Sequence, residues 1–326
     1  MKKTKLFKNL LKIIILLLSL SNQVNAQESN NGKAKSDSIL INYLKEYKIE
    51  TTTKNELKLL KSGEEKFIDL FTEIERAKHH IHLEYFNFRN DSIANLLFEV
   101  LGRKASEGVK VRAIFDAFGN WSNNQPLKKK HLKKIQEKGI EIVKFDPFTF
   151  PWINHAFHRD HRKIVIIDGK IGYTGGMNIA DYYINGLPEI GEWRDMHIRI
   201  KGNAVNHLQD IFLDMWNKCT NEDVGGASYY PYKHGLNFKE SQVKEVAIVD
   251  RYPKRNPEDM RNIYAKAIES AENKVQIINP YFTPTKTIKK AIKKALKKGV
   301  KVEIMIPGKS DIGFTPDAAL YIVNKL

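Results

Sequence analysis

An internal repeat constrains the fold more than any other feature of this 326-residue sequence. The first copy has a helical pattern from Phe71, an apolar strand over 81–86 that ends in Tyr-Phe, a second helix, and a strand that begins Gly-Val-Lys-Val at Gly108. Roughly 190 residues later the same order returns, with a strand over 275–282 and a second Gly-Val-Lys-Val at Gly299. A glycine typically ends a helix, and the order strand, helix, strand is a βαβ unit. The sequence therefore predicts a duplicated α/β fold.

A polar motif lies between the two copies. His161-Arg162-Lys163 opens a strand whose next residues are apolar, and Asp168-Gly169 turns the chain into a second strand. Because side chains alternate along a strand, His161 and Lys163 are predicted on one face, while Ile164 and Ile166 face the core. Farther on, Gly175-Gly176 permits close backbone approach, which lets Asn178 place its amide beside the same pocket.

The residue types in this motif suit attack on a phosphodiester. A neutral His161 can act as nucleophile and form a covalent intermediate, while Lys163 and Asn178 stabilise charge on the phosphoryl oxygens. Such a nucleophile also needs an acid to orient its far nitrogen, and Asp195 is the candidate. Asp168 is a catalytic candidate by its place in the motif, although its short acceptor side chain suits it to holding backbone amides at the turn. A single strand histidine is usually a packed residue, but this ordered set predicts a functional site.

The motif resembles the signature of the phospholipase D superfamily, H-x-K-x4-D-x6-G-[GS]-x-N, at every fixed position. A finer similarity, to bacterial cardiolipin synthases, extends over about residues 65–326 and rests on four segments. They are Asp116-Ala117-Phe118-Gly119, the stretch 161–170, the stretch 174–179 and Trp193-Arg194-Asp195.

The resemblance implies a phospholipase-D-like α-β-α sandwich and a phosphohistidine mechanism without metal or cofactor. His161 would be the nucleophile, Lys163, Asn178 and Gly176 would bind the substrate phosphate, and Asp195 would orient the imidazole. The reaction would transfer a phosphatidyl group from one phosphatidylglycerol to another and release glycerol.

The sequence departs from these synthases in two places. After Asn178-Ile179 the family commonly reads Gly-Asp-Glu-Tyr, whereas this chain reads Ala-Asp-Tyr-Tyr over 180–183. Such synthases usually begin with membrane-spanning helices, whereas this chain begins with lysines, an apolar run over 10–20 and an A-x-A-like end at Ala26. That pattern predicts a signal peptide over 1–26, with an uncleaved anchor as the alternative. We therefore expect an exported protein of the cell envelope that is associated with a membrane.

Superfamily active sites pair two such motifs, and only one is present in this sequence. A second His at the same offset from Gly299 would fall beyond Leu326. Three hypotheses follow: a piece of a longer enzyme, which we favour, a half-site that pairs with another copy, or an inactive homologue. The corresponding domains are a linker and N-terminal segment over 27–60, a complete first domain over 61–222 and a partial second domain over 223–326.

Several further residues are weaker candidates. Glu84 and Asp116 lie at or near the ends of predicted strands, where α/β folds place their sites, and are candidates for lining the pocket. His155 and His158 have a metal-like spacing with His161, but the aromatic residues around them favour a substrate-contacting or interfacial segment over 145–157. The neighbouring histidines His79, His80 and His82 are predicted to serve the fold.

A formal charge of +16 indicates an anionic partner. The aromatic segment favours a lipid over a nucleic acid, so we expect phosphatidylglycerol and a membrane surface as partners. Two other functions are compatible with the sequence. One is a secreted phospholipase D or nuclease that uses the same motif to hydrolyse phosphodiesters, and the other is a basic envelope protein without catalysis. The single cysteine, Cys219, excludes an intramolecular disulfide.

Overall fold

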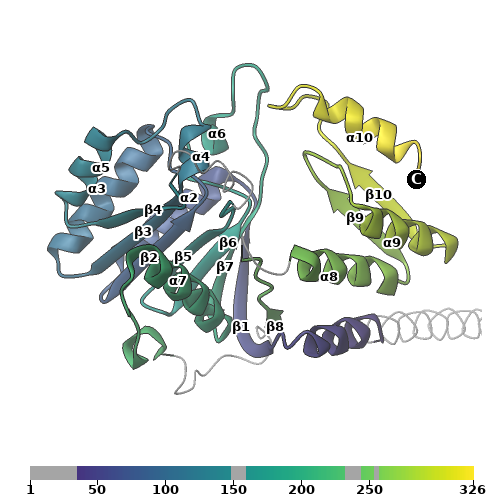
Figure 1. The fold of residues 1–326 in the computed structure, drawn as a ribbon, viewed down its shortest axis with the longest axis horizontal. Coiled ribbons are helices and arrows are strands. Elements are labelled where there is room, and N and C mark those ends of the chain that lie inside the picture. The colour runs from purple at the N-terminus through teal and green to yellow at the C-terminus, as the bar shows by residue number, and fades with distance from the viewer. Residues whose placement is uncertain (1–34, 148–158, 232–243, 253–256) are drawn as a thin grey trace, which may run out of the picture. The chain divides into compact units, whose positions relative to one another are not determined.

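The computed structural model describes residues 35–147, 159–231, 244–252 and 257–326. The chain forms two compact units, one of Ile49–Pro257 and one that combines the residues up to Lys48 with Glu258–Leu326. Figure 1 labels the helices and strands of each unit. The predicted signal peptide and most of the aromatic segment over 145–157 lie outside the described residues.

The larger unit is built on a mixed eight-stranded sheet with the order β4-β3-β2-β5-β6-β7-β1-β8 (Figure 1). Its strands β2, β3 and β4 are parallel, and every pair from β2·β5 to β1·β8 is antiparallel. The strand bounds are β1 Thr51–Leu60, β2 His80–Tyr85, β3 Lys110–Asp116, β4 Glu141–Phe145, β5 Lys163–Ile167, β6 Ile171–Gly175, β7 His197–Gly202 and β8 Lys244–Ala247.

The first predicted βαβ unit is confirmed as β2, α3 (Ser92–Ser106) and β3. The Asp91 carboxylate accepts the amide of Ala94 at 3.2 Å and so begins the helix. After α3, Gly108 adopts a φ of +91°, a conformation that favours glycine and releases the chain into β3.

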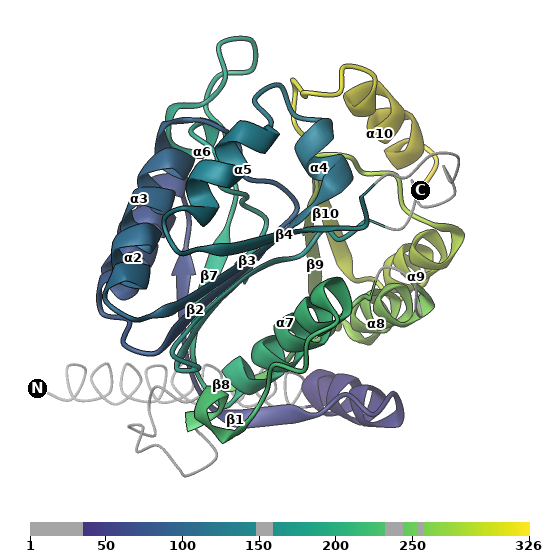
Figure 2. The same cartoon turned by 60° about the vertical axis from the view of Figure 1, so that its left-hand side comes forward.

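Helices cover both faces of the large sheet, which gives the predicted layered α/β architecture (Figure 2). On one face α2 and α3 bury apolar residues such as Leu70, Leu97 and Leu101 against β2 and β3. On the other face α7 buries Leu208, Phe212 and others against Ile164, Ile166 and Ile200. The helix bounds are α2 Gly63–Glu75, α4 Ala117–Trp121, α5 Lys129–Gln136, α6 Tyr182–Asn185 and α7 Ala204–Thr220.

The smaller unit contains the second copy of the repeat. Strands β9 (Lys274–Ile278) and β10 (Lys301–Met305) pair in parallel and are joined by α9 (Lys286–Lys297), which confirms the second βαβ unit. Residues from α9 and from α10 (Thr315–Val323), including Ala291, Ile292, Ala295 and Ala319, form its core with α8 (Pro257–Ser270).

Two expected domain boundaries lie elsewhere in the structure. Residues 51–60, expected within a linker and N-terminal segment, form β1 and pair with β7. Residues 244–247, expected in the second domain, form β8 and extend the first sheet beyond β1. Both strands are polar and lie near the sheet edge, so they lack the apolar runs that reveal the central strands.

Candidate active site

The motif lies at the centre of the large sheet. Strand β5 pairs with β2 on one side and β6 on the other, with Lys163 opposite Tyr85. Its side chains alternate: Ile164 and Ile166 join the core under α7, as predicted, while Val165 and Ile167 join the core under α2 and α3. The direction of each motif side chain is therefore fixed by the pleat of a central strand.

His161 and Lys163 meet on the side of the sheet that carries α2 and α3. The Lys163 ammonium donates to the backbone carbonyl of His161 at 2.8 Å and lies 3.2 Å from the imidazole Nδ1. The ring of Phe86 lies 4.6 Å from the imidazole, centre to centre, and the ammonium lies 5.4 Å from that ring. The predicted nucleophile and the predicted phosphate-binding cation are thus brought together.

The electrostatic environment keeps the imidazole neutral. Surrounding protein, and secondly the Lys163 ammonium, lower the pKa of His161 to about 4, even though the side chain is accessible from outside. Burial lowers the pKa of Lys163 to about 8, an effect opposed by the carboxylates of Asp160, Asp195 and Asp116. Near neutral pH, His161 is therefore an unprotonated base and Lys163 is mostly a cation.

The backbone at Asn178 is held by a buried lysine that was not predicted from the sequence. The Lys66 ammonium, at 0% exposure in the first turn of α2, donates to the carbonyls of Asn178 at 2.9 Å and Met177 at 3.1 Å. It also lies 5.1 Å from the centre of the Tyr85 ring. The only available signal was that Lys66 falls on the apolar stripe of an amphipathic helix, where a charge is unexpected.

Within the described part of the chain, the Asn178 side chain has a paired donor and an unpaired acceptor. Its Nδ2 donates to the Tyr183 hydroxyl at 3.4 Å, while its buried Oδ1 has no hydrogen-bond partner among the described residues. The Tyr183 hydroxyl in turn accepts from Tyr182 at 3.1 Å, and both tyrosine rings pack against Trp193. Tyr182, where the sequence departs from the family pattern, and Tyr183, where it matches that pattern, therefore support the motif amide.

Asp195 lies directly beside the motif. A Cβ atom at Gly176 would overlap the Asp195 carboxylate, so a larger residue there would have to displace that carboxylate. Burial raises the pKa of Asp195, while the Met196 amide at 2.7 Å and the cations Lys163 and Lys66 oppose the rise. Within the described residues no hydrogen bond joins Asp195 to His161, so its orienting role stays a prediction.

A second histidine is buried behind the motif. His197 is 1% exposed, and neither of its ring nitrogens has a hydrogen-bond partner among the described residues. Burial, with the nearby cations Lys66 and Lys163, holds the pKa of His197 well below its usual value. A Cβ atom at Gly175 would overlap His197, so the first glycine of the pair provides the space that this ring occupies.

Asp168 lies at the opposite end of β5 from His161. The five residues of β5 lie between them, and at the usual rise of about 3.3 Å per residue this strand alone is about 16 Å long. Its carboxylate accepts the backbone amides of Lys78, His79 and His80 at 2.9, 2.7 and 3.0 Å. It therefore fastens the start of β2 to the end of β5, the backbone-holding role that its side chain suits.

Glu84 and Asp116 are completely buried and belong to an ion cluster on the α7 side of the sheet. The Arg162 guanidinium binds Glu84 at 3.0 Å and forms a two-pronged pair with Asp250 at 2.6 and 2.7 Å. Asp116 accepts the amide of Asp160 at 2.8 Å and pairs with Arg159 at 3.4 Å. Both predicted pocket residues thus bind the segment 159–162 from the α7 side of the sheet.

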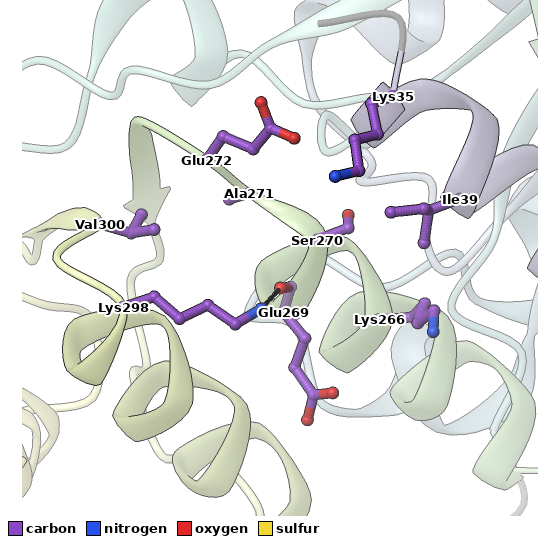
Figure 3. A pocket seen from close by; sticks show the side chains of 9 residues that line it. All are labelled: Lys35, Ile39, Lys266, Glu269, Ser270, Ala271, Glu272, Lys298 and Val300. Carbon is purple, nitrogen blue, oxygen red and sulfur yellow. Dashed lines mark hydrogen bonds between the residues drawn. The ribbon is translucent and has the colours of Figure 1, made fainter. Parts of the chain in front are cut away.

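A separate pocket lies within the smaller unit (Figure 3). This cavity of about 440 Å³ contains none of the predicted site residues, and one of its lysines, Lys298, donates to the carbonyl of Glu269 at 2.7 Å. Over the described part of the chain, no group of three or more His, Cys, Asp and Glu side chains is placed to hold a metal ion. His155 and His158 lie outside that part.

The sequence profile of the family described as cardiolipin synthase, PLD-like domain, matches residues 70–216 and 264–326. This chain belongs to that family. It is 39% identical to a cardiolipin synthase of Listeria monocytogenes serotype 4b over 278 residues, which cover 84% of this chain and 56% of the relative. It is 35% identical to cardiolipin synthase 1 of Bacillus cereus over 269 residues, 80% of this chain and 50% of the relative. The chain thus spans about half the length of these curated relatives.

A solved structure supports the fold assignment. Phosphatidylserine synthase from Haemophilus influenzae Rd KW20 superimposes with a TM-score of 0.54 at 15% identity, over 77% of this chain and 61% of that chain. At this identity the likeness concerns the fold alone. None of the helices in the described ranges is long and apolar enough to cross a membrane.

Proposed function

We propose that this protein transfers phosphatidyl groups between phosphatidylglycerol molecules, with His161 as the nucleophile. The observation that carries the proposal is the contact between a neutral imidazole and the Lys163 ammonium at 3.2 Å, in a chain of the cardiolipin synthase family. Nucleophile and phosphate-binding groups are held by one central strand and the turn that follows its neighbour.

In the first step an imidazole nitrogen of His161 attacks the phosphorus of the donor lipid. A P–N bond forms, the P–O bond to the departing glycerol breaks, and the glycerol oxygen takes up a proton. In the second step the hydroxyl of an acceptor phosphatidylglycerol attacks the phosphohistidine and gives its proton to the group that protonated the glycerol. The P–N bond breaks, which forms cardiolipin and frees the imidazole. Splitting one displacement into two lowers each barrier.

Lys163 and Asn178 provide the stabilisation of the phosphoryl oxygens. The Lys163 ammonium now donates to the His161 carbonyl, and an arriving phosphate oxygen can take over one of its three hydrogens. Charge-assisted contacts of this kind matter most where charge develops in the transition state. Asp195 is proposed to hold the imidazole nitrogen that does not attack, once Lys163 turns to the phosphate.

The proton for the departing glycerol is proposed to come from a second motif histidine. The 326 residues contain one H-x-K-x4-D motif, and the superfamily pattern pairs two. We infer that the second half-site comes from a polypeptide segment outside these residues, with a second copy of this chain as the other source. The site is proposed to act at the surface of an anionic membrane on the outer side of the cell, consistent with the charge of +16.

The nucleophile can be tested separately from the proton donor. A phosphatidyl ester of p-nitrophenol has a leaving group that needs no proton, so one half-site suffices for the first step. We expect one equivalent of p-nitrophenolate per chain and a covalent lipid on His161. His161→Ala should release none, whereas replacement of the exposed His79 by Ala should leave the burst unchanged. A burst that survives His161→Ala contradicts the assignment.

The acceptor can be tested with labelled phosphatidylglycerol. The protein should form labelled cardiolipin and glycerol when the second half-site is present. Formation of phosphatidic acid alone would assign a hydrolase instead, and release of nucleotides from DNA would assign a nuclease. Mixing His161→Ala chains with wild-type chains separates the two sources of the second histidine, because activity falls more than in proportion only if copies pair.

A further inference from the structure

Two carboxylates of the ion cluster each leave one oxygen without a donor. Glu84 and Asp160 are both 0% exposed, and the Oε2 of Glu84 and the Oδ2 of Asp160 receive no hydrogen bond from any described residue. Their other oxygens approach one nitrogen, Nη1 of Arg162, at 3.0 Å and 3.9 Å. Two buried acids therefore face the same cation, and each has an unused oxygen.

The surrounding charges do not compensate both acids. Arg162 is shared with Asp250, which takes two of its donors. Arg159 is occupied with Asp116 and Asp146. From α7, the thiol of Cys219, whose pKa burial raises to about 12, supplies no cation, and Lys218 pairs with Asp214. Lys163 attracts Asp160 from the other side of the strand, but its ammonium donates to the His161 carbonyl. Among the described residues, a second negative charge at this place would therefore have no cation hydrogen-bonded to it, which is costly in a buried environment.

We propose that Glu84 and Asp160 share one proton, and that this carboxylic acid–carboxylate pair positions the segment that carries His161. A hydrogen bond from one acid to the other uses both free oxygens and leaves a single negative charge for Arg162. Burial, then the neighbouring Asp160, raises the pKa of Glu84 well above its usual value, and burial raises that of Asp160. The pair lies outside the reacting groups, so both acids are positioning residues.

The pair acts on the nucleophile through the strand. Asp160 directly precedes His161, and Asp160 and Arg162 face the α7 side while His161 and Lys163 face the other. The Asp160 carboxylate also accepts the amide of Arg162 at 3.2 Å, and its own amide donates to Asp116. Anchors at 160 and 162 therefore set the backbone from which the imidazole projects.

Amide substitutions test the shared proton because an amide imitates a protonated acid. Glu84→Gln and Asp160→Asn each keep one carboxylate and one donor between the two side chains. We expect each single variant to keep its burst rate within about threefold, since the hydrogen bond and the charge are preserved. The double variant has no carboxylate left for Arg162 and should lose at least about tenfold, with no rescue by changes in substrate concentration.

Two other results would overturn the proposal. If each single amide variant loses as much as the double, the two acids are separately ionised. If Glu84→Leu is as active as Glu84→Gln, the hydrogen bond has no effect on the nucleophile. Asp69→Asn, which alters a buried acid bound to Lys58 and Tyr173 away from this cluster, is the matched control for general loss of stability.

Infrared spectroscopy makes the test independent of turnover. The expected effect of the amide variants on the burst rate rests on the proposed function, whereas the presence of the shared proton does not. The wild-type chain at pH 7 should show the carbonyl band of a protonated carboxylic acid, and Glu84→Gln should lack it. A wild-type spectrum without that band refutes the shared proton even if phosphatidyl transfer is found. The band in a chain without transferase activity refutes only the proposed function.

Discussion

At the scale of single residues, each side chain of the site is held in place by the groups that it contacts. His161, Lys163 and Asn178 could be identified from the sequence because their spacing repeats a chemical pattern. Lys66, Arg162 and Asp160 could not, since their partners are far away in the chain. A buried lysine that binds two carbonyls is visible only after α2 and the 176–178 turn have been placed together.

The neutral His161 should set the acid limit of the proposed first step. Because the pKa of His161 is lowered to about 4, protonation should reduce the burst rate only as the pH falls through about 4, and the rate should be flat from pH 7 to 5. Lys163→Met removes the smaller of the two causes that lower the pKa of His161. The pH midpoint of the burst rate should therefore move upward, part of the way from about 4 to the usual 6.5. Burst rates from pH 3.5 to 7 check this, with circular dichroism at each pH as the control for unfolding. A midpoint near 6.5 in the wild type would contradict it.

Lys66 is predicted to act on the reaction through Asn178. Lys66→Met removes both carbonyl contacts, and a displaced motif amide should lower the burst rate by roughly tenfold to 100-fold. The free energy of unfolding should change by less than roughly 2 kcal/mol, because the loss of hydrogen bonds is opposed by removal of a buried charge.

The coupling between Lys66 and Asn178 can be measured by a double-mutant cycle. In an Asn178→Ala background, Lys66→Met should cause little further loss of rate. Lys58→Met is the matched control, because Lys58 is half exposed and binds Asp69 away from the motif. Additive losses in the double variant would show that Lys66 serves the fold in general.

At the scale of elements, the interface between β2 and α7 contains a buried polar network. The Oε1 of Gln209 on α7 accepts from His80 Nε2 at 3.1 Å, and its Nε2 donates to His82 Nδ1 at 2.9 Å. These contacts confirm both histidines as fold residues. The side chain of His79, by contrast, is exposed. Burial lowers the pKa of His80 to about 4 and holds that of His82 well below its usual value.

This network makes stability depend on pH in a defined direction. The folded pKa of His80 lies below the usual 6.5, so the unfolded chain binds more protons between pH 6.5 and 4. The stabilisation is complete above about 6.5 and is lost as the pH falls toward 4, by up to roughly 3 kcal/mol at about 1.4 kcal/mol per pKa unit. Urea unfolding at pH 7 and 4.5 measures it, and His80→Gln should show a smaller difference. An equal difference in His80→Gln and wild type would contradict the prediction, and His79→Ala is the control.

The elements themselves were largely predictable, with an informative exception. The two βαβ units follow from apolar strands and glycine-ended helices, because those patterns are local. Strands β1 and β8 were missed because residues 51–60 and 244–247 are mostly polar, and their pairing depends on an edge formed by β7. Edge strands take their structure from a neighbour rather than from their own sequence.

At the scale of the whole molecule, the two copies of the repeat stand on sheets of unequal size. Strand β2 is flanked on both sides in an eight-stranded sheet, whereas β9 and β10 form a sheet of two strands. Side chains such as Ile278 at 67% exposure and Met305 at 61% are accessible in the smaller sheet. A two-stranded sheet gains less from burial, so its local stability should be lower.

Hydrogen exchange should reveal this difference directly. Amides in β2 and β5 should exchange more slowly than those in β9 and β10, by at least roughly 100-fold, since opening of the smaller sheet costs less. Mass spectrometry of peptides from one sample gives both values at the same pH and temperature. Equal protection in β5 and β9 would show that the smaller unit is as stable as the larger one.

The alternation along 160–163 has a consequence for how this stretch can vary. Odd-numbered residues face the proposed phosphate site and even-numbered residues face the ion cluster, with β5 held between β2 and β6. Inserting or deleting one residue here would exchange the two sets, directing Arg162 toward the phosphate and His161 toward Glu84. Insertion of two residues would preserve the sides but move the nucleophile along the strand axis. Length at this point is thus as much a part of the chemistry as residue identity, and viable variants should differ here by substitution alone.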